Sequence, residues 1–163
     1  GFNYLFKDRM VKSSYHLIKS TDKLEVHFKE DRMVLKPKKV VLGVGSRKGI
    51  SCDSVLFAVG NACDDLGIPV DRIDLMVTAE PKEGENGIME AADRLNLQLE
   101  VVSLGDLRRF KHPEISKSPW VMKNFKIPGV CEPTALYAAG DHARLVYRKK
   151  AFDGVTVAIA VAT

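Results

Sequence analysis

The stretch from Val40 to Ser51 constrains the fold of this chain more than any other, because three structural signals follow one another within it. Val40, Val41 and Leu42 form an apolar run without alternation, which is typical of a strand covered on both faces. Glycines follow at three positions, and glycine permits positive φ angles or the close approach of a ligand or another backbone. Ser51 is a good N-cap. The stretch therefore predicts a strand, a glycine-rich turn and a helix.

The predicted turn combines features that suit an anionic ligand. A helix N-terminus presents unpaired N–H groups and the positive end of a dipole, and Arg47 and Lys48 add positive charge beside it. The turn lacks the Gly-Lys-Ser/Thr ending of a P-loop, and Lys48 stands where the dinucleotide fingerprint has its third glycine. Since glycines also occur in such turns for geometry alone, anion binding and a purely structural role are both open at this point.

The composition fits a globular protein with a real core, since 45% of the 163 residues are hydrophobic and 28% are charged. The formal net charge of +4 is mild and dispersed, which argues against nucleic acid and suits an acidic small molecule. The three cysteines match neither a zinc pattern nor a disulfide framework, so we expect a cytoplasmic protein without a bound metal. The sequence shows no signal peptide or membrane span, so we expect no membrane partner.

Strands and helices alternate along the chain after Lys38, which is typical of an α/β domain. We predict a helix from Ser51 to a stop at Gly67, a strand at 73–77, a helix around 88–95, a strand at 99–102, a short helix capped by Ser103, a helix at 130–139, and strands at 145–147 and 155–161 joined at Asp153-Gly154. These elements predict three layers, α/β/α, around a mostly parallel sheet with a C-terminal antiparallel hairpin. The loops at 43–51 and 78–87 should then face each other across a crevice.

Two regions stand apart from this pattern. Residues 1–37 have too few apolar residues for a core, and they contain predicted strands at 15–18 and 24–28. We interpret them as the tail of an upstream domain or an edge hairpin plus a linker, with the main domain at 38–163. Because the chain begins with glycine, we expect a fragment of a longer polypeptide. Residues 111–129 contain three prolines and are predicted to be irregular, and such long connections are often functional.

Four motifs occur in a fixed order along the main domain: 42–49 (LGVGSRKG), 78–87 (TAEPKEGENG), 129–136 (GVCEPTAL) and 156–160 (TVAIA). In this order and spacing, the chain resembles the C-terminal domain of the cobalamin-biosynthesis protein CbiG, which is shared with the smaller protein CobE. The resemblance covers residues 38–163. Ser46 stands where many turns of this family have cysteine, which argues against an obligatory thiol there. Residues 1–37 would correspond to the end of the CbiG middle region, which favours CbiG over CobE.

The resemblance implies an activity, a substrate and partners. CbiG is the cobalt-precorrin-5A hydrolase of the anaerobic route to vitamin B12, and it opens a δ-lactone on the macrocycle and releases acetaldehyde. The implied substrate is an acidic cobalt-corrinoid, so the cobalt would arrive with the substrate and the protein would bind no cofactor. Neighbouring enzymes of the pathway and a second copy of the chain are further candidate partners. The alternatives are a non-catalytic, CobE-like module that binds a corrinoid intermediate and a generic nucleotide-binding α/β domain.

Residues within the matching motifs form a candidate site. The residues predicted to bind the substrate are Gly43, Gly45, Ser46, Arg47, Lys48, Thr78 and Lys82. Lactone opening needs a base that activates water, and the acidic candidates are Glu80, Glu83, Glu85 and Glu132. Among these four, Glu85 is preferred and Glu132 is the second choice, because Glu85 lies three residues after Lys82 at a predicted helix start. Both glutamates would also suit a first helical turn for electrostatic reasons alone, and Arg47 and Lys82 are equally consistent with solvated surface charges.

Overall fold

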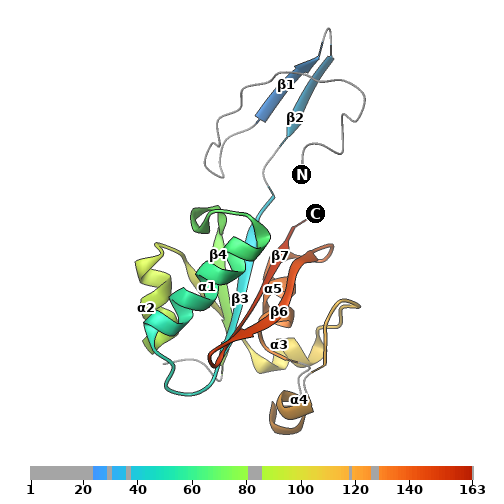
Figure 1. Ribbon diagram of the computed structural model, residues 1–163. Coiled ribbons are helices and arrows are strands. Elements are labelled where there is room, and N and C mark those ends of the chain that lie inside the picture. Colours follow the sequence, from blue (N-terminus) through green and yellow to red (C-terminus); the bar gives the residue numbers. More distant parts are fainter. Residues whose placement is uncertain are drawn as a thin grey trace.

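The computed structural model describes residues 24–28, 31–35, 38–80, 86–117, 119–125 and 129–162 (Figure 1). In chain order, the elements are β1 (Leu24–Phe28), β2 (Asp31–Leu35), β3 (Val40–Ser46), α1 (Cys52–Leu66), the 3₁₀ helix η2 (Val70–Arg72), β4 (Leu75–Ala79), α2 (Asn86–Arg94), β5 (Leu99–Val102), α3 (Leu104–Arg109), α4 (Pro119–Phe125), α5 (Cys131–Ala139), β6 (Arg144–Phe152) and β7 (Val155–Val161). β1 and β2 form a two-stranded sheet, and the other five strands form a second sheet.

The five-stranded sheet has the strand order β5-β4-β3-β7-β6. β3 and β4 pair in parallel, as do β4 and β5, whereas β7 is antiparallel to both of its neighbours, β3 and β6. Four strands of this sheet therefore run in one direction and β7 runs against them. The predicted α/β class is confirmed, together with the mostly parallel sheet and the antiparallel hairpin at the end of the chain.

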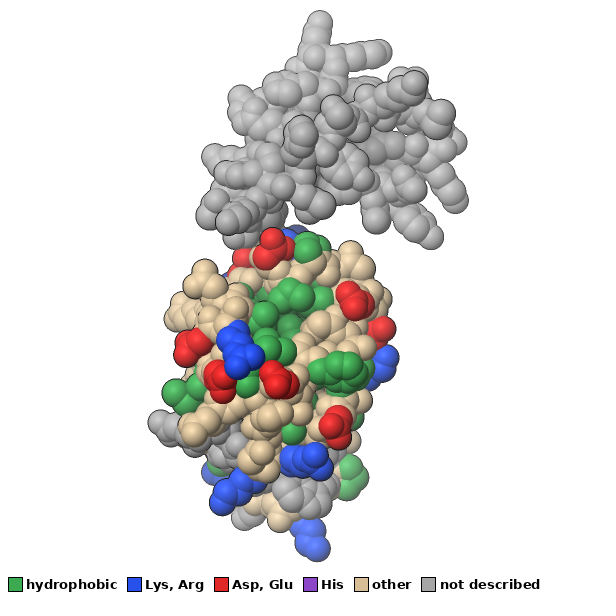
Figure 2. Space-filling model, turned by 60° about the vertical axis from the view of Figure 1, so that its left-hand side comes forward, with side chains coloured by type: hydrophobic (Ala, Val, Ile, Leu, Met, Phe, Trp, Pro, Cys, Tyr) green, Lys and Arg blue, Asp and Glu red, His purple; other side chains and the backbone are tan. Residues whose placement is uncertain are grey.

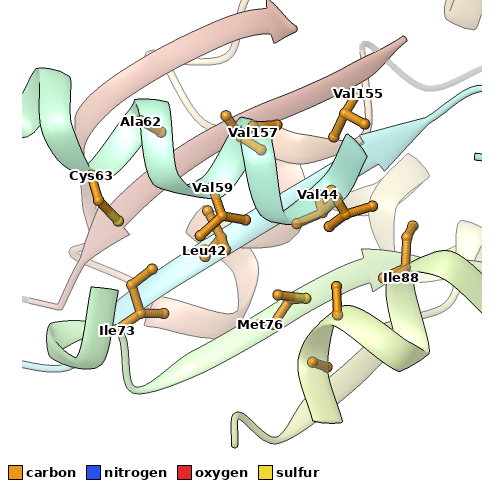
Figure 3. Packing of buried hydrophobic residues seen from close by; sticks show 14 of the residues in the cluster. Leu42, Val44, Val59, Ala62, Cys63, Ile73, Met76, Ile88, Val155 and Val157 are labelled. Atoms are coloured by element: carbon orange, nitrogen blue, oxygen red, sulfur yellow. The ribbon is translucent and has the colours of Figure 1, made fainter. Parts of the chain in front are cut away.

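Helices cover both faces of this sheet and give the three predicted layers. On one face, α1 and α2 pack over Leu42, Val44 and Met76 (Figure 3). On the other face, α3 and α5 pack over a second cluster that includes Val41 and Leu136. β3 is thus buried on both sides, which explains why its sequence is apolar without alternation.

The helix α1 begins and ends where the local sequence signals predict. The Ser51 side chain accepts a hydrogen bond from the Ser54 N–H at 3.2 Å, and Gly67 ends the helix in the left-handed conformation with φ 71°. Cys52 and Cys63 lie on its buried stripe. Burial raises the pKa of the Cys63 thiol to about 11, so this side chain is a packing residue rather than a reactive thiol.

The strand β3 is longer than predicted, and this changes the interpretation of the glycine-rich stretch. It continues through Gly43 and Gly45 to Ser46, so the turn begins at Arg47. Only Gly49 of the three glycines has a positive φ, at 73°. The prediction that the turn starts at Gly43 was therefore wrong, because the first two glycines are strand residues.

The two hairpins show one confirmed turn and one unexpected partner. β6 and β7 are joined at Asp153 and Gly154, whose φ angles of 43° and 84° suit the tight turn predicted from Asp-Gly. The predicted strand at 24–28 is β1, but it pairs with β2, which the sequence pattern did not predict because it starts with two charged residues. The other predicted strand, at 15–18, lies outside the described residues.

The connection between α3 and α5 contains one short helix, α4, which begins at Pro119 as the fixed φ of proline permits. Before α4, the chain follows β6. His112 Nε2 lies 3.1 Å from the carbonyl oxygen of Ala143, and the Leu145 N–H donates to the Glu114 carboxylate at 2.8 Å. The connection is therefore ordered by specific contacts with the edge strand of the sheet.

Candidate functional site

The carboxyl ends of β3 and β4 lie at the same edge of the sheet, because the two strands are parallel neighbours with Gly43 opposite Val77. The loop that follows β3 exposes Arg47 and Lys48 and turns at Gly49 into the start of α1. The start of α2 lies at the same edge, because Gly87 packs against the residues that lead into α1. The predicted crevice between the loops at 43–51 and 78–87 stays a prediction, since residues 81–85 lie outside the described residues.

The first turn of α2 packs against Ile50 and Ser51, the two residues that lead into α1. A Cβ atom placed on Gly87, in the first turn of α2, would lie 2.9 Å from the carbonyl carbon of Ser51 and closer still to the oxygen of Ile50. Only glycine permits this approach. Two helix N-termini with their positive dipole ends are therefore brought together. The sequence analysis missed this role of Gly87, although an Asn-Gly pair at a predicted helix start was its visible signal.

The exposed Arg47 side chain leans toward the β6–β7 turn. Its guanidinium lies 3.8 Å from Asp153 Oδ1, and its side chain covers Gly154, where an added Cβ would come within 2.6 Å of Arg47 Nε. Both partners of the ion pair are more than two-thirds exposed, so the pair contributes little to stability. Arg47 is thus a solvent-accessible cation that can exchange Asp153 for an anionic ligand.

The two hydroxyl groups of the predicted site have different environments. Thr78 is buried, and its Oγ1 donates to the carbonyl oxygen of Val44 at 2.8 Å, so its proton is not available to a substrate carboxylate. Ser46 Oγ is buried at the end of β3 and has no hydrogen-bond partner among the residues that the structure describes. A buried hydroxyl without a partner is costly, so Ser46 is the better candidate for binding a ligand.

Gly43 and Gly45 serve packing rather than ligand contact. A Cβ on Gly43 would lie 2.8 Å from the carbonyl carbon of Cys131, and a Cβ on Gly45 would lie 3.2 Å from Cβ of Val130. The first turn of α5 therefore crosses β3 directly over the two glycines. Their predicted role in binding substrate is corrected by this geometry, because the space above them is filled by the protein itself.

Glu132, predicted as a candidate base, is buried and accepts hydrogen bonds from three donors. The Ser116 N–H donates at 2.8 Å and the Lys149 N–H at 2.9 Å, and the Ser116 hydroxyl is the third donor. Burial alone would raise the pKa of the Glu132 carboxyl, but these hydrogen bonds outweigh it and lower the pKa below its usual value. This geometry favours a structural role over that of a base, since Glu132 joins α5 to β6 and to the segment before α4.

The other acidic candidates precede α2 or lie beside it. Glu80 follows β4, and its carboxylate accepts the Leu104 N–H at 3.0 Å, which caps α3. Lys82, Glu83 and Glu85 lie in the 81–85 segment, outside the described residues. The roles of Lys82 in binding and of Glu85 as the base therefore stay predictions, as does a pocket between Arg47 and Lys82.

Other kinds of site are not indicated by the described parts of the chain. Over these ranges, no group of three or more histidine, cysteine or acidic side chains is arranged to hold a metal ion. Cys131, the first residue of α5, is buried, and burial raises the pKa of its thiol to about 12. None of the helices from α1 to α5, as far as the structure describes them, has the length and apolar character needed to cross a bilayer.

A profile of the family described as "Cobalamin synthesis G C-terminus" matches residues 40–160, which is most of the chain and the whole of the five-stranded sheet apart from its last residue. The chain belongs to this family. The match includes the carboxyl edge of β3 and β4 and the α5 turn that packs over Gly43. The contacts described above are therefore features of a cobalamin synthesis G C-terminal domain.

Relatives of this cobalamin synthesis G domain support the assignment. The chain is 35% identical over 157 residues to a Methanocaldococcus jannaschii protein described as a probable cobalt-precorrin-5A hydrolase, an alignment that covers 91% of this chain and 47% of that protein. The crystal structure of cobalamin biosynthesis protein chiG from Agrobacterium tumefaciens shares 33% identity with a TM-score of 0.58, covering 76% of this chain and 98% of the other. The chain thus spans about half the length of the first relative.

The crystal structure of CobE, a protein from the cobalamin biosynthetic pathway, has the same fold. It aligns with a TM-score of 0.72 and 21% identity, and covers 78% of this chain and 92% of CobE. At this identity, the similarity establishes the fold alone. The α/β fold predicted from the alternation of strands and helices is therefore the fold of a protein with a solved structure.

Proposed function

We propose that this chain is part of a cobalt-precorrin-5A hydrolase of anaerobic cobalamin biosynthesis, and that it binds the acidic corrinoid at the carboxyl edge of β3 and β4. The observation that carries the proposal is the contact of Gly87, in the first turn of α2, with the residues that lead into α1, next to the exposed Arg47 and Lys48. Two helix N-termini and two cations at one edge suit carboxylates on the rim of a macrocycle. The names of the relatives supply the substrate.

The proposed reaction opens the δ-lactone of the substrate and ends in the release of acetaldehyde. Water attacks the lactone carbonyl while a base takes its proton, and the tetrahedral oxyanion collapses to a carboxylate as the lactone C–O bond breaks. The released alkoxide then becomes the carbonyl of acetaldehyde while its C–C bond to the macrocycle breaks, and the macrocycle takes up that electron pair and the proton held by the base. We assign the base to Glu85 and the stabilisation of the oxyanion to the N–H groups of the α1 and α2 first turns. Arg47, Lys48, Lys82 and the Ser46 hydroxyl would hold the substrate carboxylates.

The remaining parts of the proposal concern the protein as a whole. The alignment with the Methanocaldococcus protein covers more of this chain than residues 38–163 could supply, which supports residues 1–37 as the tail of a preceding region of a CbiG-type protein. The cobalt would belong to the corrinoid substrate, and no cofactor would be bound by the protein. Three buried cysteines without a disulfide suit a reducing cytoplasm.

The base assignment is tested in the full-length protein with Glu85→Gln, measuring acetaldehyde released from cobalt-precorrin-5A. We expect a loss of at least about a hundredfold in kcat, because general base catalysis typically contributes that much. Glu90→Gln is the matched control, since Glu90 lies on α2 at the surface and pairs with Arg94 at 2.7 Å. Near-normal turnover in Glu85→Gln would end the assignment.

The second candidate function is a CobE-like module that binds a corrinoid intermediate without chemistry. Two measurements on the chain alone separate the candidates. An absorbance titration with a corrinoid acid detects binding, and an acetaldehyde assay detects hydrolysis. Binding without acetaldehyde release by both the chain and the full-length protein would favour the module, whereas release by the full-length protein would favour the hydrolase.

A further inference from the structure

The short helix α4 presents an apolar side chain, Met122, to solvent. The described side chains of this helix are those of Pro119, Met122, Lys123 and Asn124, and all four are exposed. Met122 is 44% exposed, and Lys123 is exposed beside it. Single exposed apolar side chains are common on protein surfaces, so what points to a ligand here is the position of Met122 beside exposed cations.

The chain leaves the domain before α4 and returns to it at nearly the same point. We call the residues between these two points, 117–128, the α4 excursion. A Cβ on Gly129 would lie 3.9 Å from the carbonyl oxygen of Ser116, so the residues that flank the α4 excursion are adjacent. Glu132 holds the attachment point of this segment, because its carboxylate accepts hydrogen bonds from Ser116. Val130, next to the returning end, packs on Gly45 at the carboxyl end of β3. The excursion is thus attached at the edge that holds the candidate site, and α4 lies at this end of the molecule in Figure 1.

The surroundings of α4 are basic. Between 104 and 125, the described residues include five lysines and arginines but only two acidic residues, Asp106 and Glu114. Both acids are engaged, since Asp106 pairs with Arg109 at 2.7 Å and Glu114 accepts the Leu145 N–H. Lys and Arg side chains gather at the lower end of the molecule in Figure 2, whereas Asp and Glu side chains lie mainly above them.

We propose that the α4 excursion contacts the bound tetrapyrrole, with Met122 against the face of the ring and Lys117 and Lys123 on its rim carboxylates. This inference rests on the proposed function and identifies a second element of the same site. An apolar ring with an acidic rim complements an apolar side chain flanked by cations, and the flexible thioether of Met122 adapts to such a face. Glu132 is then a positioning residue, because it holds the residue that precedes the α4 excursion, Ser116, against α5 and β6.

The test compares variants that place a negative charge on α4 with matched control variants elsewhere in the chain. Met122→Glu and Lys123→Glu alter the excursion. Val146→Glu is the control for Met122, because Val146 is 41% exposed near the start of β6, at the opposite edge of the sheet. Lys39→Glu is the control for Lys123, since the exposed Lys39 precedes β3 at that opposite edge. Circular dichroism establishes that each variant is folded.

The probe is uroporphyrin, a tetrapyrrole with acetate and propionate side chains, and its fully esterified form is the uncharged control. Binding is followed by quenching of tryptophan fluorescence, because the single tryptophan of the chain is Trp120 in α4. We expect Kd to rise at least about fivefold in both excursion variants and by less than twofold in both controls. The unaltered chain should bind the ester more weakly than it binds uroporphyrin. The Kd for the ester should be the same for Lys123→Glu as for the unaltered chain.

The outcomes separate this inference from the proposed function. Unchanged affinity for uroporphyrin in Met122→Glu and Lys123→Glu, with binding by the unaltered chain intact, would overturn the inference and leave the proposed function standing. Equal weakening in the controls would also overturn it, because the effect would then follow net charge alone. Absence of binding by the unaltered chain to both uroporphyrin and a corrinoid acid would overturn the proposed function and this inference together.

Discussion

Replacing Gly43 by alanine tests whether this glycine serves packing or ligand binding. The new Cβ would lie 2.8 Å from the carbonyl carbon of Cys131 and 3.0 Å from Cβ of Ala135, and closer still to the Cys131 oxygen. Two of these three atoms belong to main chain in the first turn of α5, which cannot rotate away as a flexible side chain could. The helix must therefore move off β3, and with it the packing of a whole face of the sheet.

The size of the effect follows from this geometry. Extra methyl groups in a packed core cost about 1–3 kcal/mol, and a clash with main chain belongs at the upper end of that range. We expect the free energy of unfolding to fall by about 3 kcal/mol. For a chain of this length, each kcal/mol lowers Tm by roughly 2–4 °C, so Tm should drop by roughly 6–12 °C.

Urea unfolding followed by circular dichroism measures this change, and Gly60→Ala is the matched control. Gly60 lies within α1, and a Cβ there meets no other atom within 4 Å. Alanine should therefore stabilise that helix by about 0.5–1 kcal/mol. Stability of Gly43→Ala equal to that of the unaltered chain, combined with lost affinity for a corrinoid acid, would refute the packing argument and restore the predicted role in binding.

Two further predictions follow from buried ionisable groups. Burial raises the pKa of Cys63 to about 11 and of Cys131 to about 12, so neither thiol should react with Ellman's reagent at pH 8 in the native protein, whereas both should react in urea; rapid native labelling would contradict their burial. The pKa of the Glu132 carboxyl is lower in the folded state than its ordinary value of 4.5, so its stabilising effect is present above pH 4.5 and is lost as the pH falls through the folded pKa. Glu132→Gln should therefore be less stable at neutral pH, and its unfolding free energy should fall less steeply below pH 4.5; parallel curves for the two proteins would contradict this linkage.

The elements that the sequence predicted well are those fixed by local signals. α1 is set by the Ser51 cap, its helical spacing of apolar residues and the Gly67 stop, all of which lie within the helix or next to it. The tight turn at Asp153-Gly154 is likewise a property of two adjacent residues. Such features need no knowledge of distant parts of the chain, so one sequence was enough to place them.

The glycines at 43 and 45 show what local reasoning could not decide. In sequence they are equally consistent with a phosphate-type loop and with a strand crossed by another element. The element that decides between these is α5, which lies almost ninety positions later, with its first turn against β3. Only the pairing of distant segments shows that the close backbone approach is internal. The hydrogen bond from the buried Thr78 hydroxyl to the Val44 carbonyl oxygen could not be predicted for the same reason, because it joins two different strands.

The same lesson bears on the choice of a catalytic base among four glutamates. A carboxylate in the sequence is equally a base, a helix cap or the acceptor for a neighbouring strand. Two of the four carboxylates accept hydrogen bonds from main-chain N–H groups. Glu80 caps α3 in this way, and Glu132 joins β6 to the segment before α4. A base must be able to reach water and the lactone, and Glu132, which is buried and held by three donors, cannot. Glu80 is exposed and accepts the Leu104 N–H, so it stays a candidate beside Glu83 and Glu85, and Glu80→Gln and Glu83→Gln belong beside Glu85→Gln in the acetaldehyde assay. Loss of turnover in only one of the three would identify the base, whereas full activity in all three would contradict a glutamate base in this domain.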